Sequence, residues 1–104
     1  MNATPNGGAH ATRAIELAAV LDLRAAAPLA AKFLARRGEA VEVDASRVQR
    51  MGGQCLQILL SAIKTWKADA IPLAVVEPSF GFIEGVRRLG VATAEFLDEE
   101  DVPQ

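Results

Sequence analysis

Side chains able to carry out covalent or acid–base chemistry are few in this sequence. His10 is the only histidine and Cys55 the only cysteine among 104 residues. Nucleophilic catalysis needs an activated nucleophile, a base and usually a group that orients the base. His10 lies in a leader rich in Ala, Gly, Asn and Thr, which we expect to be mobile and solvated. The sequence therefore supplies no catalytic set, and we predict that the protein is not an enzyme.

Cys55 opens an expected helix, where the helix dipole can lower a thiol pKa. The apolar residues around it favour a buried small side chain instead, so a redox sensor is the weaker alternative. One cysteine cannot form an internal disulfide, and a zinc site would lack ligands. A reducing cytoplasm is the simplest setting for such a chain.

Gly52-Gly53 stands at an expected strand-to-helix turn, where backbone N–H groups can face an anion. No phosphate-loop motif accompanies the pair, so we favour a tight turn that needs a permissive backbone. The acidic residues also lack the spacing of a metal or acid–base site; they include Glu16, Asp22, Asp44, Glu77 and Glu84. We expect neither a metal nor a cofactor.

Composition excludes other classes of function. The net charge is −2 and no basic run is present, which argues against nucleic-acid binding. No apolar run reaches the roughly 18–20 residues of a membrane span, and residues 1–13 do not resemble an export signal. The length predicts one domain over residues 14–98, preceded by the disordered leader 1–13 and followed by an acidic tail, 99–104. We expect a cytoplasmic protein.

Strand and helix patterns alternate along this domain. Residues 14–23 are typical of one long strand or two short ones, and strands are expected from Ala40 and over 72–77. Residues 93–97 are consistent with an edge strand. Helices are expected over 26–38, 53–68 and 80–90, of which the first and last are closed by Gly38 and Gly90. This order predicts an α/β domain with a small, largely parallel sheet and helices packed against it.

Helical spacing places apolar residues on one face of each of the first two helices. The face of the first is formed by Ala26, Leu29, Ala30, Phe33 and Leu34. The face of the second is formed by Leu56, Leu59, Leu60, Ile63 and Trp66. Pro28 is expected in a first turn, where its missing N–H is harmless. Ser79 is a good N-cap for the third helix.

Several motifs occur in the order found in one known family. They are Val20-Leu21-Asp22-Leu23, Asp44-Ala45-Ser46, Met51-Gly52-Gly53-Gln54, the Leu-rich run 56–60, Pro78-Ser79 and Leu89-Gly90-Val91. In this respect the sequence resembles the STAS domains typified by anti-sigma-factor antagonists. The resemblance implies a STAS-like fold and a non-enzymatic signalling role. The closer pattern is similar to small stand-alone STAS proteins of bacterial chemotaxis clusters.

The chain departs from that family at one informative place. Antagonists of this type carry a Ser or Thr in the loop before the second helix, and a partner kinase phosphorylates it. Residues 52–55 are Gly, Gly, Gln and Cys, so the usual phospho-acceptor is absent. The phosphate charge that can release a partner from that helix end is therefore unavailable here.

The resemblance implies a docking surface for a protein partner, a histidine kinase or a response regulator. It would comprise Arg47, Gln49, Arg50, Gly52, Gly53, Gln54, Gln57, Ser61 and Lys64. Considered alone, these residue types favour an ordinary solvated helix face, and only the resemblance favours a docking surface. Trp66 is either an interface anchor or a core aromatic. The alternative function is an accessory STAS subunit of a bacterial lipid-transport ATPase, and a nucleotide-binding domain is the weakest reading. The oligomeric state is left open.

Overall fold

A computed structural model describes residues 14–96. The predicted leader, 1–13, and the predicted acidic tail, 99–104, lie outside the described residues. The elements are β1 (Ala14–Glu16), β2 (Val20–Leu21), α2 (Leu23–Ala35), β3 (Val41–Asp44), β4 (Arg50–Met51), α3 (Gly53–Ala68), β5 (Leu73–Val76), α4 (Phe80–Arg88) and the 3-10 helix η1 (Thr93–Glu95).

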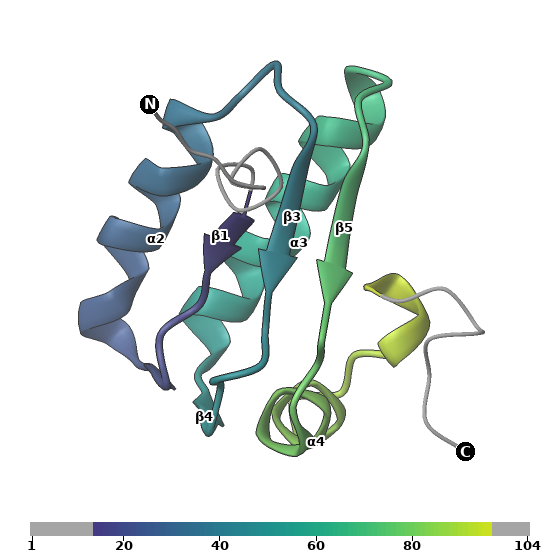
Figure 1. The fold of residues 1–104 in the computed structure, drawn as a ribbon. Coiled ribbons are helices and arrows are strands. Elements are labelled where there is room, and N and C mark those ends of the chain that lie inside the picture. Colours follow the sequence, from purple (N-terminus) through teal and green to yellow (C-terminus); the bar gives the residue numbers. More distant parts are fainter. Residues whose placement is uncertain (1–13, 97–104) are drawn as a thin grey trace, which may run out of the picture.

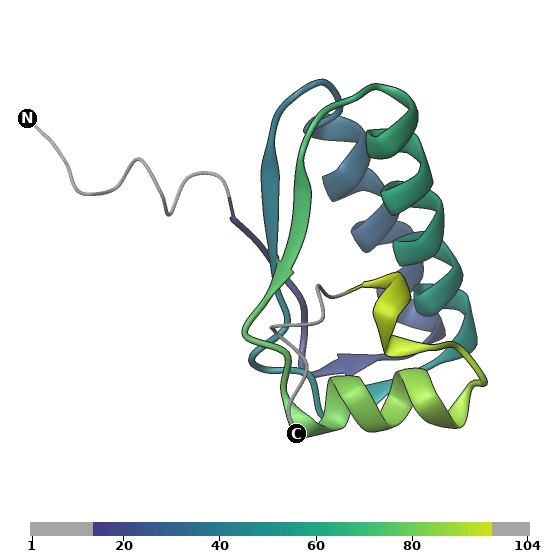
Figure 2. The ribbon, with the colours of Figure 1, turned by 90° about the vertical axis from the view of Figure 1, so that its right-hand side faces the viewer.

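A three-stranded parallel sheet in the order β1-β3-β5 forms the centre of the fold. Ile15 pairs with Val43, which pairs in turn with Val75, and all three side chains are buried. The helices α2 and α3 lie side by side against one face of this sheet (Figures 1 and 2). The predicted α/β class, with parallel strands and helices packed on them, is confirmed.

A second, two-stranded parallel ladder joins β2 to β4. The residues of 14–23 therefore form two short strands, one in each sheet, whereas β4 was missed by the sequence analysis. The Ala19 carbonyl accepts hydrogen bonds from the N–H groups of Gln49 (2.7 Å) and Arg50 (3.1 Å). These bonds hold Gln49 and the first residue of β4, Arg50, beside the residue that precedes β2, although no apolar alternation predicts a strand here.

The first helix differs from its prediction in two ways. It begins at Leu23, because the Asp22 carboxylate accepts from the N–H groups of Arg24 (3.0 Å) and Ala25 (3.3 Å) and caps an earlier turn. Pro28 therefore lies inside the helix, and its predicted place in the first turn is wrong. Because proline has no backbone N–H, the Arg24 carbonyl lacks its helical hydrogen bond. Both Pro28 and Arg24 are exposed, so water can bind that carbonyl instead.

Leu34 does not belong to the buried face of α2. Its side chain is 73% exposed, whereas Ala26, Leu29 and Phe33 are buried. The sheet and α3 together do not cover the full width of the apolar stripe of α2. The α3 helix agrees better with its prediction, since it spans Gly53–Ala68 and buries Leu56, Leu59 and Trp66.

The predicted edge strand over 93–97 is wrong. After Gly90, in a left-handed conformation (φ +86°), the chain turns into η1. This turn buries Phe96 against Phe82, with ring centroids 5.6 Å apart and edge to face. Packing of Phe96 on the α4 side chain of Phe82 is thus preferred to an extended strand over these residues.

Two glycines let α4 lie against the segment before β4. The helix runs across the carboxyl ends of the strands (Figure 2). A Cβ atom at Gly81 would lie 2.6 Å from the Val48 carbonyl oxygen, and one at Gly85 would lie 2.6 Å from the Met51 Cβ. Both distances are shorter than any real contact, so the packing requires residues without a side chain here.

We predict that Gly81→Ala lowers the free energy of unfolding by about 1–3 kcal/mol, because rigid backbone atoms must move away from the new methyl group. Gly53→Ala is the matched control, since nothing lies within 4 Å of a Cβ there. Gly53 is helical, so its replacement is expected to be neutral or stabilising by up to about 1 kcal/mol. Urea unfolding followed by circular dichroism measures both variants. Equal losses would contradict the close-packing argument.

Candidate docking surface

The predicted docking residues gather around the amino-terminal end of α3. The N-cap of α3 is Gly52, which has no side chain that could cap the helix, and Gly53 is the first helical residue. The Gly52 N–H donates to the Leu21 carbonyl (2.8 Å), and a Cβ at Gly52 would lie 3.0 Å from that oxygen. The Gly52 φ of −96° is ordinary. The expectation of a permissive backbone is therefore wrong, and the notable feature of this position is the close approach of β2, which would make a Cβ contact tight.

Four of the predicted residues form a stripe along α3. Gln54, Gln57, Ser61 and Lys64 are all exposed, and their spacing of three, four and three residues keeps them on one helical face. This stripe runs opposite the buried residues of α3, such as Leu59 and Trp66. The structure thus makes these four side chains accessible together, and whether a partner contacts them stays a prediction.

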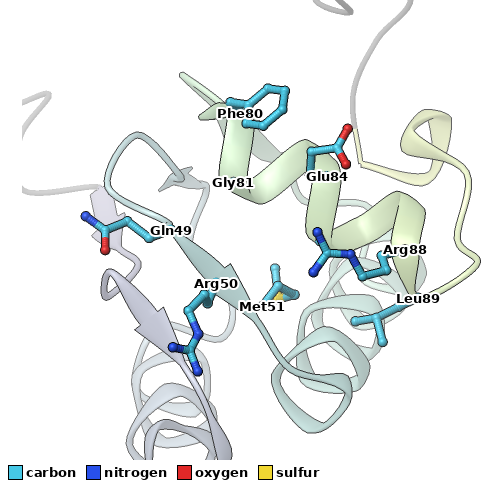
Figure 3. Close-up of a pocket in the computed structure, with 9 residues that line it drawn as sticks. Gln49, Arg50, Met51, Phe80, Gly81, Glu84, Arg88 and Leu89 are labelled. Carbon is cyan, nitrogen blue, oxygen red and sulfur yellow. The ribbon is translucent and has the colours of Figure 1, made fainter.

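The remaining predicted residues precede α3. Arg47, Gln49 and Arg50 are exposed, and Gly52 is half-buried. The Arg47 guanidinium lies 3.8 Å from the Glu16 carboxylate, in an exposed ion pair. Figure 3 shows the side chains of Gln49 and Arg50 directed away from α4.

Other hydroxyl groups near this end have structural partners. The Ser79 hydroxyl donates to the Val48 carbonyl and accepts from the Phe82 N–H (3.0 Å), which confirms the predicted N-cap of α4. The Ser46 N–H donates to the Asp44 carboxylate (2.9 Å) in the turn after β3. Neither residue stands where the hydroxyl of an antagonist loop would stand, at the start of α3.

The Cys55 thiol is buried at the start of α3. It is 0% exposed, and its Sγ donates to the Asp22 carbonyl (3.4 Å). Burial raises the pKa of the Cys55 thiol, and the negative charge of Asp22 adds to this effect. The favoured reading of a buried small side chain is confirmed, and the pKa moves against the direction that a redox sensor requires.

Sequence reasoning missed two surface features. A groove of about 270 Å³ runs along the junction of β4 and α4, lined by Met51, the two helical glycines and the exposed Phe80 and Leu89 (Figure 3). A second groove lies between α2 and α3 beside Leu34. The glycines four residues apart in α4 were a usable signal for the first. The second depends on how far α2 and α3 stand apart, which no local pattern reports.

Within residues 14–96, no cluster of three or more His, Cys, Asp or Glu side chains is arranged to hold a metal ion. The helices of the same part of the chain are too short or too polar to cross a bilayer.

Comparison with known proteins gives one finding on the family. A protein-family model described as "Mlab, STAS domain" matches residues 7–98, which is most of the chain. No curated protein matches the chain at a significant level.

We predict that the Cys55 thiol reacts slowly with a disulfide reagent in the folded protein. Burial and a raised pKa both reduce the thiolate that such a reagent attacks. In urea sufficient for unfolding, the reaction is expected to reach the rate of a free cysteine peptide. Absorbance of the released thiolate measures both rates. Rapid reaction of the native protein would restore the redox-sensor alternative.

We also predict that the turn after β3 contributes pH-dependent stability. Hydrogen bonds from the Ser46 hydroxyl and N–H lower the pKa of Asp44 from its usual value of 3.8. A carboxyl whose pKa is lowered by folding stabilises the folded state above its unfolded pKa, and this contribution is lost as the pH falls through the folded pKa.

Ser46→Ala should therefore cost about 0.5–1 kcal/mol near neutral pH. The difference from the unchanged protein should shrink as the pH falls below 3.8. Urea unfolding at a series of pH values tests this, with the exposed Ser61→Ala as the control for loss of a hydroxyl group. A difference that persists at the lowest pH would contradict the assigned bond.

Proposed function

Because this chain belongs to the STAS domain family, we propose that it is a signalling adaptor that binds a kinase or response-regulator partner through the exposed stripe of α3. Domains of this family generally regulate or bind other proteins, and they are generally not enzymes. The finer assignment, an accessory protein of a bacterial chemotaxis system acting in the cytoplasm, rests on the resemblance of residues 44–62 and of the short opening to stand-alone STAS proteins.

The observation that carries this proposal is the continuous polar stripe at the amino-terminal end of α3. Gln54, Gln57 and Ser61 are exposed, uncharged and on one face. Such side chains are inexpensive to desolvate compared with charges, and they can hydrogen-bond to a partner in either direction. The segment 47–50, which precedes the stripe, adds the exposed guanidinium groups of Arg47 and Arg50.

The start of α3 also bears on how binding is controlled. Residues 52–55 carry no hydroxyl group, so a phosphate cannot be attached where antagonists of this family receive it. We infer that the partner docks constitutively or that control comes from the partner's side. Burial of Cys55 leaves no accessible nucleophile at this turn that could serve as a substitute switch.

A second candidate is an accessory subunit of a bacterial lipid-transport ATPase. The description of the matching family, which names Mlab together with the STAS domain, is the observation that favours it. The sequence counts against it mildly, because such subunits often keep a Thr in the loop that precedes the helix. Capture of bound proteins from a lysate, described next, separates the two candidates by the identity of the protein that is recovered.

We predict that the tagged domain captures a histidine kinase or a response regulator from bacterial lysate. Gln54→Glu with Gln57→Glu should abolish capture, because two new carboxylates would be buried without partners at the interface. Arg87→Gln with Arg88→Gln changes the net charge equally on exposed α4 positions and should leave capture intact. Mass spectrometry identifies the bound proteins, and circular dichroism confirms that both variants fold.

Recovery of a transport ATPase would support the second candidate instead. Capture that survives the α3 variant but is lost in the α4 variant would overturn the proposed surface.

A further inference from the structure

An apolar groove runs between the exposed sides of α2 and α3. Its volume is about 270 Å³. Phe33 and Trp66, both buried, contribute to its floor, while Leu34 and Ile58 stand along its sides. The polar residues that line it are Arg37, Gln57, Ser61 and Thr65, of which Gln57 and Ser61 belong to the α3 stripe described above.

The floor of the groove is held in place by contacts within the protein. The rings of Phe33 and Trp66 pack edge to face with centroids 6.0 Å apart. The indole N–H of Trp66 donates to the Glu39 carbonyl (2.7 Å), so its one polar atom already has a partner. The floor is therefore preformed and apolar, which lowers the cost of ordering it when a ligand binds.

Leu34 gives the groove an exposed apolar side. A single exposed leucine is common on protein surfaces and carries no weight by itself. Leu34 differs because it borders a concave apolar floor, so a side chain bound in the groove would bury Leu34 as well. Leu23 lies on the same helix and is 75% exposed, but it does not line the groove.

The charge of the two helices identifies the kind of partner that fits. Neither α2 nor α3 contains an Asp or a Glu, whereas they carry Arg24, Lys32, Lys64 and Lys67. Two acidic residues flank the helices: Asp22 caps α2 and lies 3.7 Å from the Arg24 guanidinium, and Asp69 binds Arg37 at 3.1 Å. The excess positive charge of the two helices therefore comes from Lys32, Lys64 and Lys67. The helical layer is thus positively charged in a chain of net charge −2. An acidic ligand is favoured over a basic one.

We propose that this groove receives an acidic amphipathic helix of the protein partner, an inference that rests on the proposed function because the groove and the α3 stripe share Gln57 and Ser61. The groove extends from Gln57 to Thr65, or about 12 Å at the rise of an α-helix. That length matches apolar anchors at positions i, i+4 and i+7 of the bound helix. Its carboxylates are expected on the side of the exposed Lys64, which belongs to the α3 stripe.

Two other occupants fit the observations less well. A lipid bilayer presents a flat surface, whereas the apolar atoms here line a hollow. A second copy of this chain would bring α2 or α3, whose charged side chains are all basic, against the same basic layer.

Trp66 is the only tryptophan of the chain and lies in the groove, so its fluorescence reports occupancy directly. The probe is a synthetic helical peptide of about 16 residues, or four turns, with leucines at the three anchor positions and flanking glutamates. A control peptide carries lysines in place of the glutamates. The full chain is titrated with each peptide, and the emission of Trp66 is followed.

The acidic peptide should change the emission saturably, and the basic peptide should not. Leu34→Gln should weaken binding about tenfold, since burial of one leucine side chain is lost. Leu23→Gln, the matched control on the same helix, should change it by less than about twofold, within the range of neutral surface changes. No response to the acidic peptide, or an equal response to both peptides, would overturn the inference.

Two further results would assign the groove to another occupant and overturn the inference as well. One is a Trp66 response to vesicles containing phosphatidylglycerol without a response to the peptide. The other is self-association in sedimentation velocity that Leu34→Gln removes.

The inference and the proposed function can fail separately. If a captured kinase is lost on Gln54→Glu with Gln57→Glu but retained on Leu34→Gln, the groove inference fails and the function stands. If the peptide titration succeeds but no signalling protein is captured, the function fails and the groove remains an acidic-helix site.

Discussion

The segment from Val48 to Gly52 is confined between two backbones, and the rest of the fold depends on that close approach. On one side, the Gly52 N–H donates to the Leu21 carbonyl (2.8 Å), and the Ala19 carbonyl accepts from the N–H groups of Gln49 and Arg50. On the other side, α4 approaches through Gly81 and Gly85. Side chains at these glycines would separate the layers. The contact thereby sets where α3 begins and where α4 lies across the strand ends.

The same contact joins the starts of the two long helices. Asp22 caps α2 with its carboxylate, while its carbonyl accepts the Cys55 Sγ in the first turn of α3. The two helices consequently leave one end of the molecule together and share one face of the sheet (Figure 1). Farther along the two helices, the buried side chains of Phe33 and Trp66 contribute to the floor of the groove between them. The groove between α2 and α3 and the polar stripe of α3 therefore lie next to each other.

Charge is distributed unevenly between the two sides of the sheet. The helical layer carries Arg and Lys in α2 and α3, whereas Glu16, Glu42 and Asp44 belong to the strands. The net charge of the whole chain does not report this difference, because it sums over all positions. A partner that contacts only the helices meets a basic surface. This uneven distribution favours docking of an acidic partner on the helical side of the sheet, although the net charge of the whole chain is small.

Local sequence signals determined the α/β class, the bounds of α3, the Ser79 cap and the left-handed glycines after α2 and α4, because each depends on residues adjacent along the chain or on helical period. The order of motifs from Asp44 to Val91 was sufficient to indicate the STAS family. Other features were decided only by tertiary contacts. Strand β4 exists because Ala19 supplies its bonds, η1 because Phe96 packs on Phe82, and Leu34 is exposed because no neighbour covers it. The tight space at Gly52 likewise comes from Leu21, which lies thirty-one residues earlier in the chain, and a distance across the fold cannot be obtained from neighbouring residues alone.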